Sequence, residues 1–267
     1  MKNVLLLVHN DVGQEARLQC ALDLARAVQG HLTCVDVEIM PRCMDDYVSS
    51  GGLGVLLAED EARQAGNRQR VEKRLADAGV SWNWAEVTGS LDHRVRLAAR
   101  LSDIIVVNAR LDQFPHYEMR HLAGELIVKS GRPLLAVPQK TTQFRVSGHA
   151  LVAWDGSSAA EAALQAAVPL LALAKDVTLV EVDDGSLDLS AERAAEYLSR
   201  HGVKSTIDRE QALTDIASTV LLAQCRILQA DWLVMGGYGH HRLVEASFGG
   251  VTRRMFRDAR IPLLLAH

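Results

Sequence analysis

The sequence predicts an α/β protein made of two similar halves, each with a mostly parallel sheet. Short apolar runs alternate with amphipathic segments along the whole chain, which is typical of right-handed βαβ units. The same pattern starts again at His149, with matching runs in the same order. The chain has 267 residues, of which 48% are hydrophobic, so it is long enough for two domains with their own cores.

In the first half, strands are expected where apolar runs are bounded by polar or turn-forming residues. These runs predict strands at 3–8, 32–37, 79–84, 103–107 and 133–137. Apolar residues at helical spacing predict a helix after Gly13 and further helices at 59–78, 91–101 and 119–129. Residues 38–56 contain Pro41 and three glycines, so we expect them to be irregular.

The second half repeats this order. Strands are expected at 150–154, 177–182, 203–207, 232–235 and 261–265, and helices after Ser158 and at 191–201, 216–229 and 251–257. Ser158 with Glu161 three residues later predicts a capping box at the start of the first of these helices. Pro169 is expected to bend or restart that helix because proline lacks a backbone N–H.

Laying one half on the other shows which segments correspond. The helical segment at Leu18 matches Leu164 at an offset of 146, and the strand at Leu32 matches Val177 at an offset of 145. The two later strands of each half match at offsets of 128 and 129. We therefore predict domains at 1–138 and 149–267, joined by a polar linker at 139–148.

Composition limits the classes of function. With 29 basic and 33 acidic residues the net charge is −4, and no basic stripe indicates a nucleic-acid partner. No apolar run is long enough for a membrane span, and the N-terminal run is too short for a signal peptide. The four cysteines lack a CxxC pair, which favours buried free thiols. We expect a cytoplasmic protein without a membrane or nucleic-acid partner.

A glycine-rich stretch follows the strand at 232–235. Gly236 and Gly239 come first, and Gly249 and Gly250 then open the last helix. A strand, a glycine loop and a helix N-terminus in this order favour anion binding, because unpaired N–H groups and the helix dipole converge there. The stretch is neither a Walker loop nor a dinucleotide fingerprint. Alternatively, the glycines only make turns.

The spacing Gly-x2-Gly-x9-Gly and the segment Ala153-Trp-Asp155-Gly-Ser-Ser resemble the universal stress protein family. The resemblance implies two open, mostly parallel five-stranded sheets with helices on both faces, the adenine nucleotide alpha-hydrolase-like fold, as a tandem repeat. Some members bind ATP or another adenine nucleotide, and others bind none. Family members commonly pair through the last strand, so the two halves could form an intramolecular pseudo-dimer, with a homodimer of whole chains as a further option.

The same resemblance assigns the candidate site. It implies that Asp155 lies near the ribose, the backbone of Val182 near adenine, and the glycine loop near the phosphates. The candidate nucleotide-binding residues are Ala153, Asp155, Val182, Gly236, Gly239, Gly249, Gly250, Val251 and Thr252. The family usually has Ser or Thr where this chain has Gly250, and Thr252 is the candidate for a replacement hydroxyl. Mg²⁺ is a further candidate ligand. Alternatively, Asp155 only caps the following helix.

The first half lacks these features. His9 occupies the place of Asp155, and the stretch directly after Val107, residues 108–115, contains no glycine, which predicts a degenerate site there. His240 and His241 are expected to be exposed loop residues, since no third metal ligand is spaced with them. We hypothesise an ATP-binding regulatory or stress-response protein with one site, in the second half. The alternatives are a scaffold of the same fold that acts through protein partners and, less favoured, a nucleotide-hydrolysing enzyme, because no catalytic residues are evident.

Overall fold

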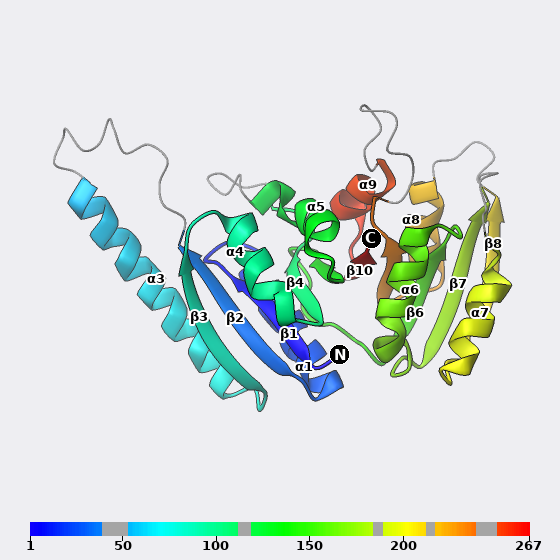
Figure 1. Cartoon of the computed structure of the whole chain (residues 1–267), viewed down its shortest axis with the longest axis horizontal. Helices are drawn as coiled ribbons and strands as arrows, with labels where there is room; N and C mark the ends of the chain where they lie inside the picture. Colours follow the sequence, from blue (N-terminus) through cyan, green and yellow to red (C-terminus); the bar gives the residue numbers. More distant parts are fainter. Residues whose placement is uncertain (39–52, 112–118, 184–188, 212–216, 239–249) are drawn as a thin grey trace.

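The chain forms one twisted ten-stranded sheet with helices on both faces (Figure 1). The computed structural model describes residues 1–38, 53–111, 119–183, 189–211, 217–238 and 250–267. The strand order is β3-β2-β1-β4-β5-β10-β9-β6-β7-β8. The first five strands come from the first half and the last five from the second, so the two halves have the same order about the centre of the sheet.

The elements of the first half follow in chain order. They are β1 (Asn3–Val8), α1 (Gln14–Val28), β2 (His31–Glu38), α3 (Leu53–Ala76), β3 (Ser81–Thr88), α4 (Leu91–Ala98) with the 3-10 turn η1 (Ala99–Leu101), β4 (Ile104–Asn108), α5 (Met119–Ser130) and β5 (Leu134–Val137). Those of the second half are β6 (His149–Trp154), α6 (Ser158–Leu171), β7 (Asp176–Asp183), α7 (Ala191–Arg200), β8 (Thr206–Gln211), α8 (Ala217–Ile227), β9 (Trp232–Gly236), α9 (Gly250–Asp258) and β10 (Leu263–Ala266).

Within each half all paired strands are parallel, whereas β5 and β10 pair antiparallel. Leu135 lies opposite Leu264 at the centre of this junction. The mostly parallel five-stranded halves are thus confirmed. The expectation of two separate sheets was wrong, because the antiparallel β5–β10 pair joins them into one.

Several local predictions need correction. Helix α3 begins at Leu53, within the region expected to be irregular, and β8 begins at Thr206 rather than at 203. The N-cap of α6 is Ser157, whose Oγ accepts a hydrogen bond from the Ala160 N–H at 3.2 Å, so the capping box at Ser158 was placed one residue too late. Pro169 does not interrupt α6, which continues for two more residues.

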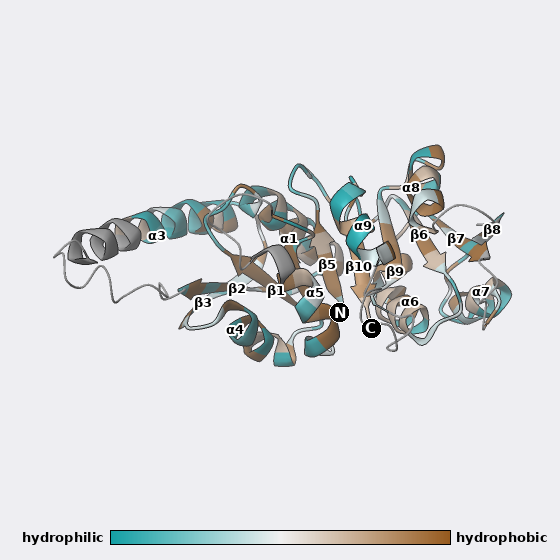
Figure 2. Ribbon diagram, turned by 90° about the horizontal axis from the view of Figure 1, so that it is seen from above, coloured by the Kyte–Doolittle hydropathy of each residue, from teal (hydrophilic) through white to brown (hydrophobic). Residues whose placement is uncertain are grey.

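Two apolar cores lie on opposite faces of the sheet. One contains buried side chains of α1, α3, α6 and α7, and the other those of α4, α5, α8 and α9. Figure 2 shows these helices on both sides of the strands. The central strands β1, β4, β9 and β10 are buried on both faces, which explains their continuous apolar sequences. No helix in the described ranges is both long and apolar enough to cross a membrane.

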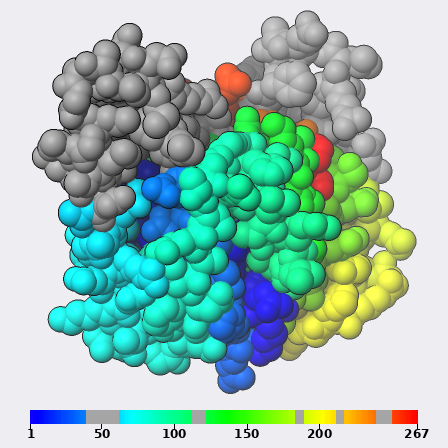
Figure 3. Space-filling view, turned by 60° about the vertical axis from the view of Figure 1, so that its left-hand side comes forward, coloured from blue at the N-terminus to red at the C-terminus, as the bar shows by residue number. Residues whose placement is uncertain are grey.

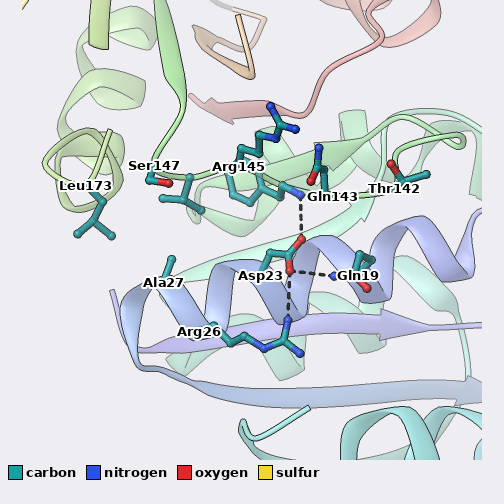
Figure 4. A pocket seen from close by; sticks show the side chains of 11 residues that line it. Gln19, Asp23, Arg26, Ala27, Thr142, Gln143, Arg145, Ser147 and Leu173 are labelled. Atoms are coloured by element: carbon teal, nitrogen blue, oxygen red, sulfur yellow. Dashed lines mark hydrogen bonds and ion pairs between the residues drawn. The ribbon is translucent and has the colours of Figure 1, made fainter. Parts of the chain in front are cut away.

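The linker packs against α1 instead of lying free in solvent. Phe144 is 3% exposed, and its ring meets Trp232 edge-on with ring centroids 5.8 Å apart. Its backbone N–H donates to Oδ2 of Asp23 at 2.9 Å (Figure 4). Asp23 also accepts hydrogen bonds from Gln19 and Arg26, beside a shallow pocket of about 670 Å³. The linker therefore holds the halves together, and they lie side by side in one body (Figure 3).

The cysteines fit the expectation of free thiols where they can be observed. Cys20, Cys34 and Cys225 are free, and the first two are buried, whereas Cys225 is half-buried. Burial raises the pKa of Cys34 to about 12 and that of Cys225 to about 11, so both remain protonated at neutral pH. Cys43 lies outside the described residues.

Candidate functional site

The candidate site lies where three neighbouring strands of the second half end. Strand β6 pairs with β7 on one side and with β9 on the other, all in parallel. Asp155 follows β6, Val182 is the penultimate residue of β7, and Gly236 ends β9. Ala153 lies on β6 and is half-buried. Ligands of open α/β sheets bind beyond such carboxyl ends, so three of the predicted residues meet at a suitable place.

A tight turn joins β6 to α6 and fixes Asp155. Its Oδ1 accepts a hydrogen bond from the backbone N–H of Ser157 at 3.0 Å, and Ser157 in turn caps α6. Gly156 between them has φ +71°, which favours glycine. Asp155 therefore supports the turn without being the N-cap residue itself. The prediction that it contacts a ribose stays a prediction.

Gly236 lies directly against the first turn of α6. A Cβ at this position would lie 2.8 Å from the backbone nitrogen of Ala160 and 2.9 Å from the carbonyl carbon of Ala159. No real side chain could be accommodated there without moving the helix. Helix packing alone thus requires this glycine. At this one position the glycine is explained by a structural role, without a bound ligand.

Helix α9 supplies the other end of the glycine-rich stretch. A Cβ on Gly250 would meet no atom within 4 Å, so a side chain fits there. Thr252 is 3% exposed, and its Oγ1 accepts a hydrogen bond from the Tyr238 N–H at 3.3 Å. The expected replacement hydroxyl therefore ties α9 to the segment that leaves β9. Val251 is half-buried beside it.

Part of the predicted site lies outside the described residues. This applies to Gly239, Gly249, His240 and His241. Within the ranges that the structure does describe, no three His, Cys, Asp or Glu side chains are arranged to hold a metal ion. The described part of the site thus consists of Ala153, Asp155, Val182, Gly236 and the first turn of α9.

The corresponding place in the first half is filled by a buried arginine. Arg17 of α1 has no exposed surface, and its guanidinium contacts both carboxylate oxygens of Asp11, at 3.1 and 2.9 Å. It also donates to the carbonyl oxygens of Leu7 at 3.0 Å and His9 at 3.1 Å, and to Oδ1 of Asn108. His9 Nδ1 lies 3.2 Å from Oδ2 of Asp11. All these partners come from the carboxyl ends of β1 and β4 or the turn after β1.

The Arg17 cluster keeps the buried Asp11 carboxylate ionised. Burial alone would raise the pKa of Asp11, but the Arg17 guanidinium and the hydrogen bonds from His9 and Arg17 hold it well below its usual range. The two buried charges are therefore paired at neutral pH.

In both halves the end of a central strand packs against the start of a helix, but the glycine lies on the helix side in the first half and on the strand in the second. At an offset of 128, Asn108 ends β4 where Gly236 ends β9. Gly13 faces Asn108, because a Cβ on Gly13 would lie 2.5 Å from its Oδ1. In the second half the helix carries the side chain, at Ala159, and the strand carries the glycine. The first half thus has an amide and a guanidinium at the end of β4, where the second half has bare backbone.

Arg17 and Asn108 were not predicted as site residues from the sequence. The signal for Arg17 was present, since it lies at helical spacing with Ala21, Leu24 and Val28, all of them buried. A charged residue on the apolar face of a helix requires a buried partner. In the structure Asp11, six residues earlier, provides this partner.

A second polar cavity lies near the ends of β2 and β3 in the first half. Its volume is about 380 Å³, and its lining includes Asp36, Glu38, Glu86 and Arg68. Burial raises the pKa of Asp36 to about 6, with a further contribution from Glu86, while His9 and Arg68 oppose the shift. The counterpart of Asp36 in the second half, Glu181, instead accepts a hydrogen bond from the Ala191 N–H at 2.6 Å and pairs with Arg209.

We expect Asp36→Asn to stabilise the protein in a pH-dependent manner. The folded-state pKa lies above the unfolded value of 3.8, so ionising Asp36 costs stability as pH rises from about 4 to about 6. At pH 7.5 the variant should gain about 1–3 kcal/mol in the free energy of unfolding, and at pH 4 well under half of that. Urea unfolding of both proteins at the two pH values measures this difference. An equal gain at both would contradict the assignment.

Comparison with known proteins places this geometry in context. Residues 147–267 match the model of the universal stress protein family. The whole chain resembles the crystal structure of a universal stress protein from Archaeoglobus fulgidus DSM 4304, with a TM-score of 0.74 and 16% identity, covering 100% of this chain and 98% of the other. The crystal structure of a functionally unknown protein from Pseudomonas aeruginosa PAO1 is similar, with a TM-score of 0.60 and 15% identity. The match covers 99% of this chain and 92% of the other. No curated protein matches the sequence. At such identities the structural likeness establishes the fold.

Proposed function

We propose that the chain binds an adenine nucleotide in its second half, because residues 147–267 match the model of the universal stress protein family and the whole chain has the fold of a universal stress protein. The nucleotide, ATP or a relative, would act as a regulatory ligand of a stress-response protein. The observation that carries the proposal is the meeting of Asp155, Val182, Gly236 and the start of α9 at the carboxyl ends of adjacent strands.

The chemistry of these residues suits the proposed ligand. A carboxylate after β6 can accept hydrogen bonds from ribose hydroxyls, and the N–H groups of the first turn of α9 favour phosphate. Asp155, Val182 and α9 would hold ribose, adenine and phosphate respectively. Mg²⁺ would neutralise phosphate charge when it accompanies the nucleotide. No hydrolytic step is assigned to any residue.

The contrast between the halves supports a single site per chain. In the first half, Arg17 and Asn108 occupy the space beyond β1 and β4, and Arg17 is held by five hydrogen bonds. A nucleotide would have to displace a buried ion pair there, which is costly. The second candidate function is a scaffold that acts through protein partners and holds no nucleotide. It is favoured by Gly236, whose presence helix packing explains without a ligand.

Calorimetry with Mg²⁺–ATP tests the proposal. We expect one site per chain, and Asp155→Ala should weaken binding by about 1–3 kcal/mol through the lost ribose contact. Gly250→Ser should instead strengthen it about tenfold or more, because its hydroxyl would reach a charged phosphate and the position has open space. Nucleotide retained by the purified protein would be visible by mass spectrometry after denaturation.

A matched control separates site effects from general ones. Gly66 is exposed on helix α3, and a Cβ there also meets no atom within 4 Å. Gly66→Ser should leave the affinity for ATP unchanged. If the unmodified protein shows no binding at millimolar ATP, the nucleotide proposal fails and the scaffold takes its place.

A further inference from the structure

The three residues that leave β9 contact elements of both halves. Gly236 lies against α6 of its own half, whereas Gly237 lies against Ile127 of α5 in the first half. A Cβ added to Gly237 would lie 2.8 Å from Cγ2 of Ile127. The Gly237 N–H donates to the Ala266 carbonyl oxygen at 2.8 Å, and the Gly237 carbonyl oxygen lies 2.9 Å from Nδ1 of His267. The segment that leads to the glycine-rich loop is thus fixed at the junction of the halves.

Tyr238, the last described residue of this segment, has an unusual backbone. Its φ is +58°, in the left-handed region, which is unfavourable for residues other than glycine. Among the described residues only Gln29 and Gln229 are also non-glycine with positive φ, and both follow the end of a helix, where this conformation is common. Tyr238 follows a strand, so tertiary contacts must hold its conformation. One of them is the hydrogen bond from its N–H to Thr252.

The side chain of Tyr238 provides the other contact. Its hydroxyl lies too close to the position of an added Cβ on Gly124 of α5 for both to fit, and its Cζ lies 3.2 Å from that position. Gly124 lies within α5, where alanine would favour the helix more than glycine does. The glycine therefore makes room for the tyrosine. Burial also raises the pKa of Tyr238, as expected for a hydroxyl enclosed between elements.

We propose that α5 of the first half positions the described part of the second-half site, Gly236–Tyr238 and the first turn of α9, through Tyr238. The first half then acts as a built-in partner that sets the affinity of a site it does not itself contain. Tyr238 is a positioning residue in this scheme: it fixes the direction in which the chain leaves β9, and Thr252 links that direction to the start of α9. The inference rests on the proposed nucleotide site for its effect on affinity.

The test compares Gly124→Ala, Tyr238→Phe, the double variant and the control Gly66→Ala. Gly124→Ala should displace Tyr238, raise the Kd for Mg²⁺–ATP about tenfold and speed amide hydrogen exchange at Gly237 and Tyr238. Tyr238→Phe alone should bind nearly as the unmodified protein does. The double variant should return to within about threefold of that affinity, because only the 3.2 Å contact remains. Recovery by a second substitution would not be seen if Gly124→Ala merely disturbed the helix.

The outcomes distinguish this inference from the nucleotide proposal. If the unmodified protein binds ATP and Gly124→Ala equals Gly66→Ala in both affinity and exchange, the role of α5 is overturned and the nucleotide site stands. If the unmodified protein binds no ATP while exchange still responds to Gly124→Ala and recovers in the double variant, α5 supports the segment but the nucleotide function is overturned. Thermal melting of each variant shows whether folding is intact.

Discussion

Arg17→Leu is expected to lower the free energy of unfolding by about 3–5 kcal/mol. The substitution leaves the Asp11 carboxylate buried without its cation, since the side chains of both residues have 0% exposure. It also removes the donors to two backbone carbonyl groups, of Leu7 and His9. Urea unfolding at pH 7 measures the loss.

Two further variants test the reason for this loss. Adding Asp11→Asn removes the stranded charge and should recover part of the stability, although the hydrogen bonds from Arg17 stay lost. Arg26→Leu on the same helix removes an arginine whose side chain is 45% exposed, so it should cost about 1 kcal/mol or less. Equal losses for the two arginines would show that burial of the Arg17 pair is not decisive.

Gly156→Ala is expected to destabilise the protein by about 2–4 kcal/mol. Two penalties add here: the positive φ of +71° and the Cβ, which would lie 2.7 Å from the carbonyl oxygen of Leu189 and still closer to its nitrogen. These are backbone atoms, so they cannot rotate away as a side chain would. The turn that carries Asp155 would shift, and binding of ATP should weaken together with stability.

Gly202→Ala separates the two penalties. Gly202 follows α7 with φ +75°, nearly the value of Gly156, but a Cβ there meets no atom within 4 Å. Its substitution should therefore cost only about 1 kcal/mol, the conformational part. Thermal and urea unfolding of both variants would give the difference. A loss at Gly202 as large as that at Gly156 would contradict the steric explanation.

How far the sequence predicted the fold depends on where each strand lies. The central strands β1, β4 and β9 were found because burial on both faces leaves an uninterrupted apolar run. Strand β8 was misplaced because it is the last strand of the sheet, and its residues, Thr206–Gln211, carry four polar or charged side chains in a row. The predicted strand began at the apolar Val203, which is buried but lies before β8 in the structure.

Residues of the candidate site could be placed from the sequence only where a local pattern determines their position. Asp155 and Gly236 were placed correctly at strand ends, because a turn must follow each apolar run. The contact of Arg17 with Asn108 could not be predicted, since residues 91 positions apart meet only once the sheet is assembled. The same holds for Gly124 and Tyr238, which belong to different halves. The antiparallel pairing of β5 with β10 is likewise not indicated by the hydrophobic pattern of either strand, because both are buried along their whole length.

That junction has a consequence for how the protein could have diverged. Two identical subunits paired through the same strands would carry every substitution twice, so an arginine at position 17 would enter both of their sites. In a single polypeptide the change appears once. The covalent connection also keeps the halves at a high effective concentration, so neither must retain a ligand for the assembly to persist. In a fused pair of such units, one copy would be free from the selection that constrains the other and could specialise as a support.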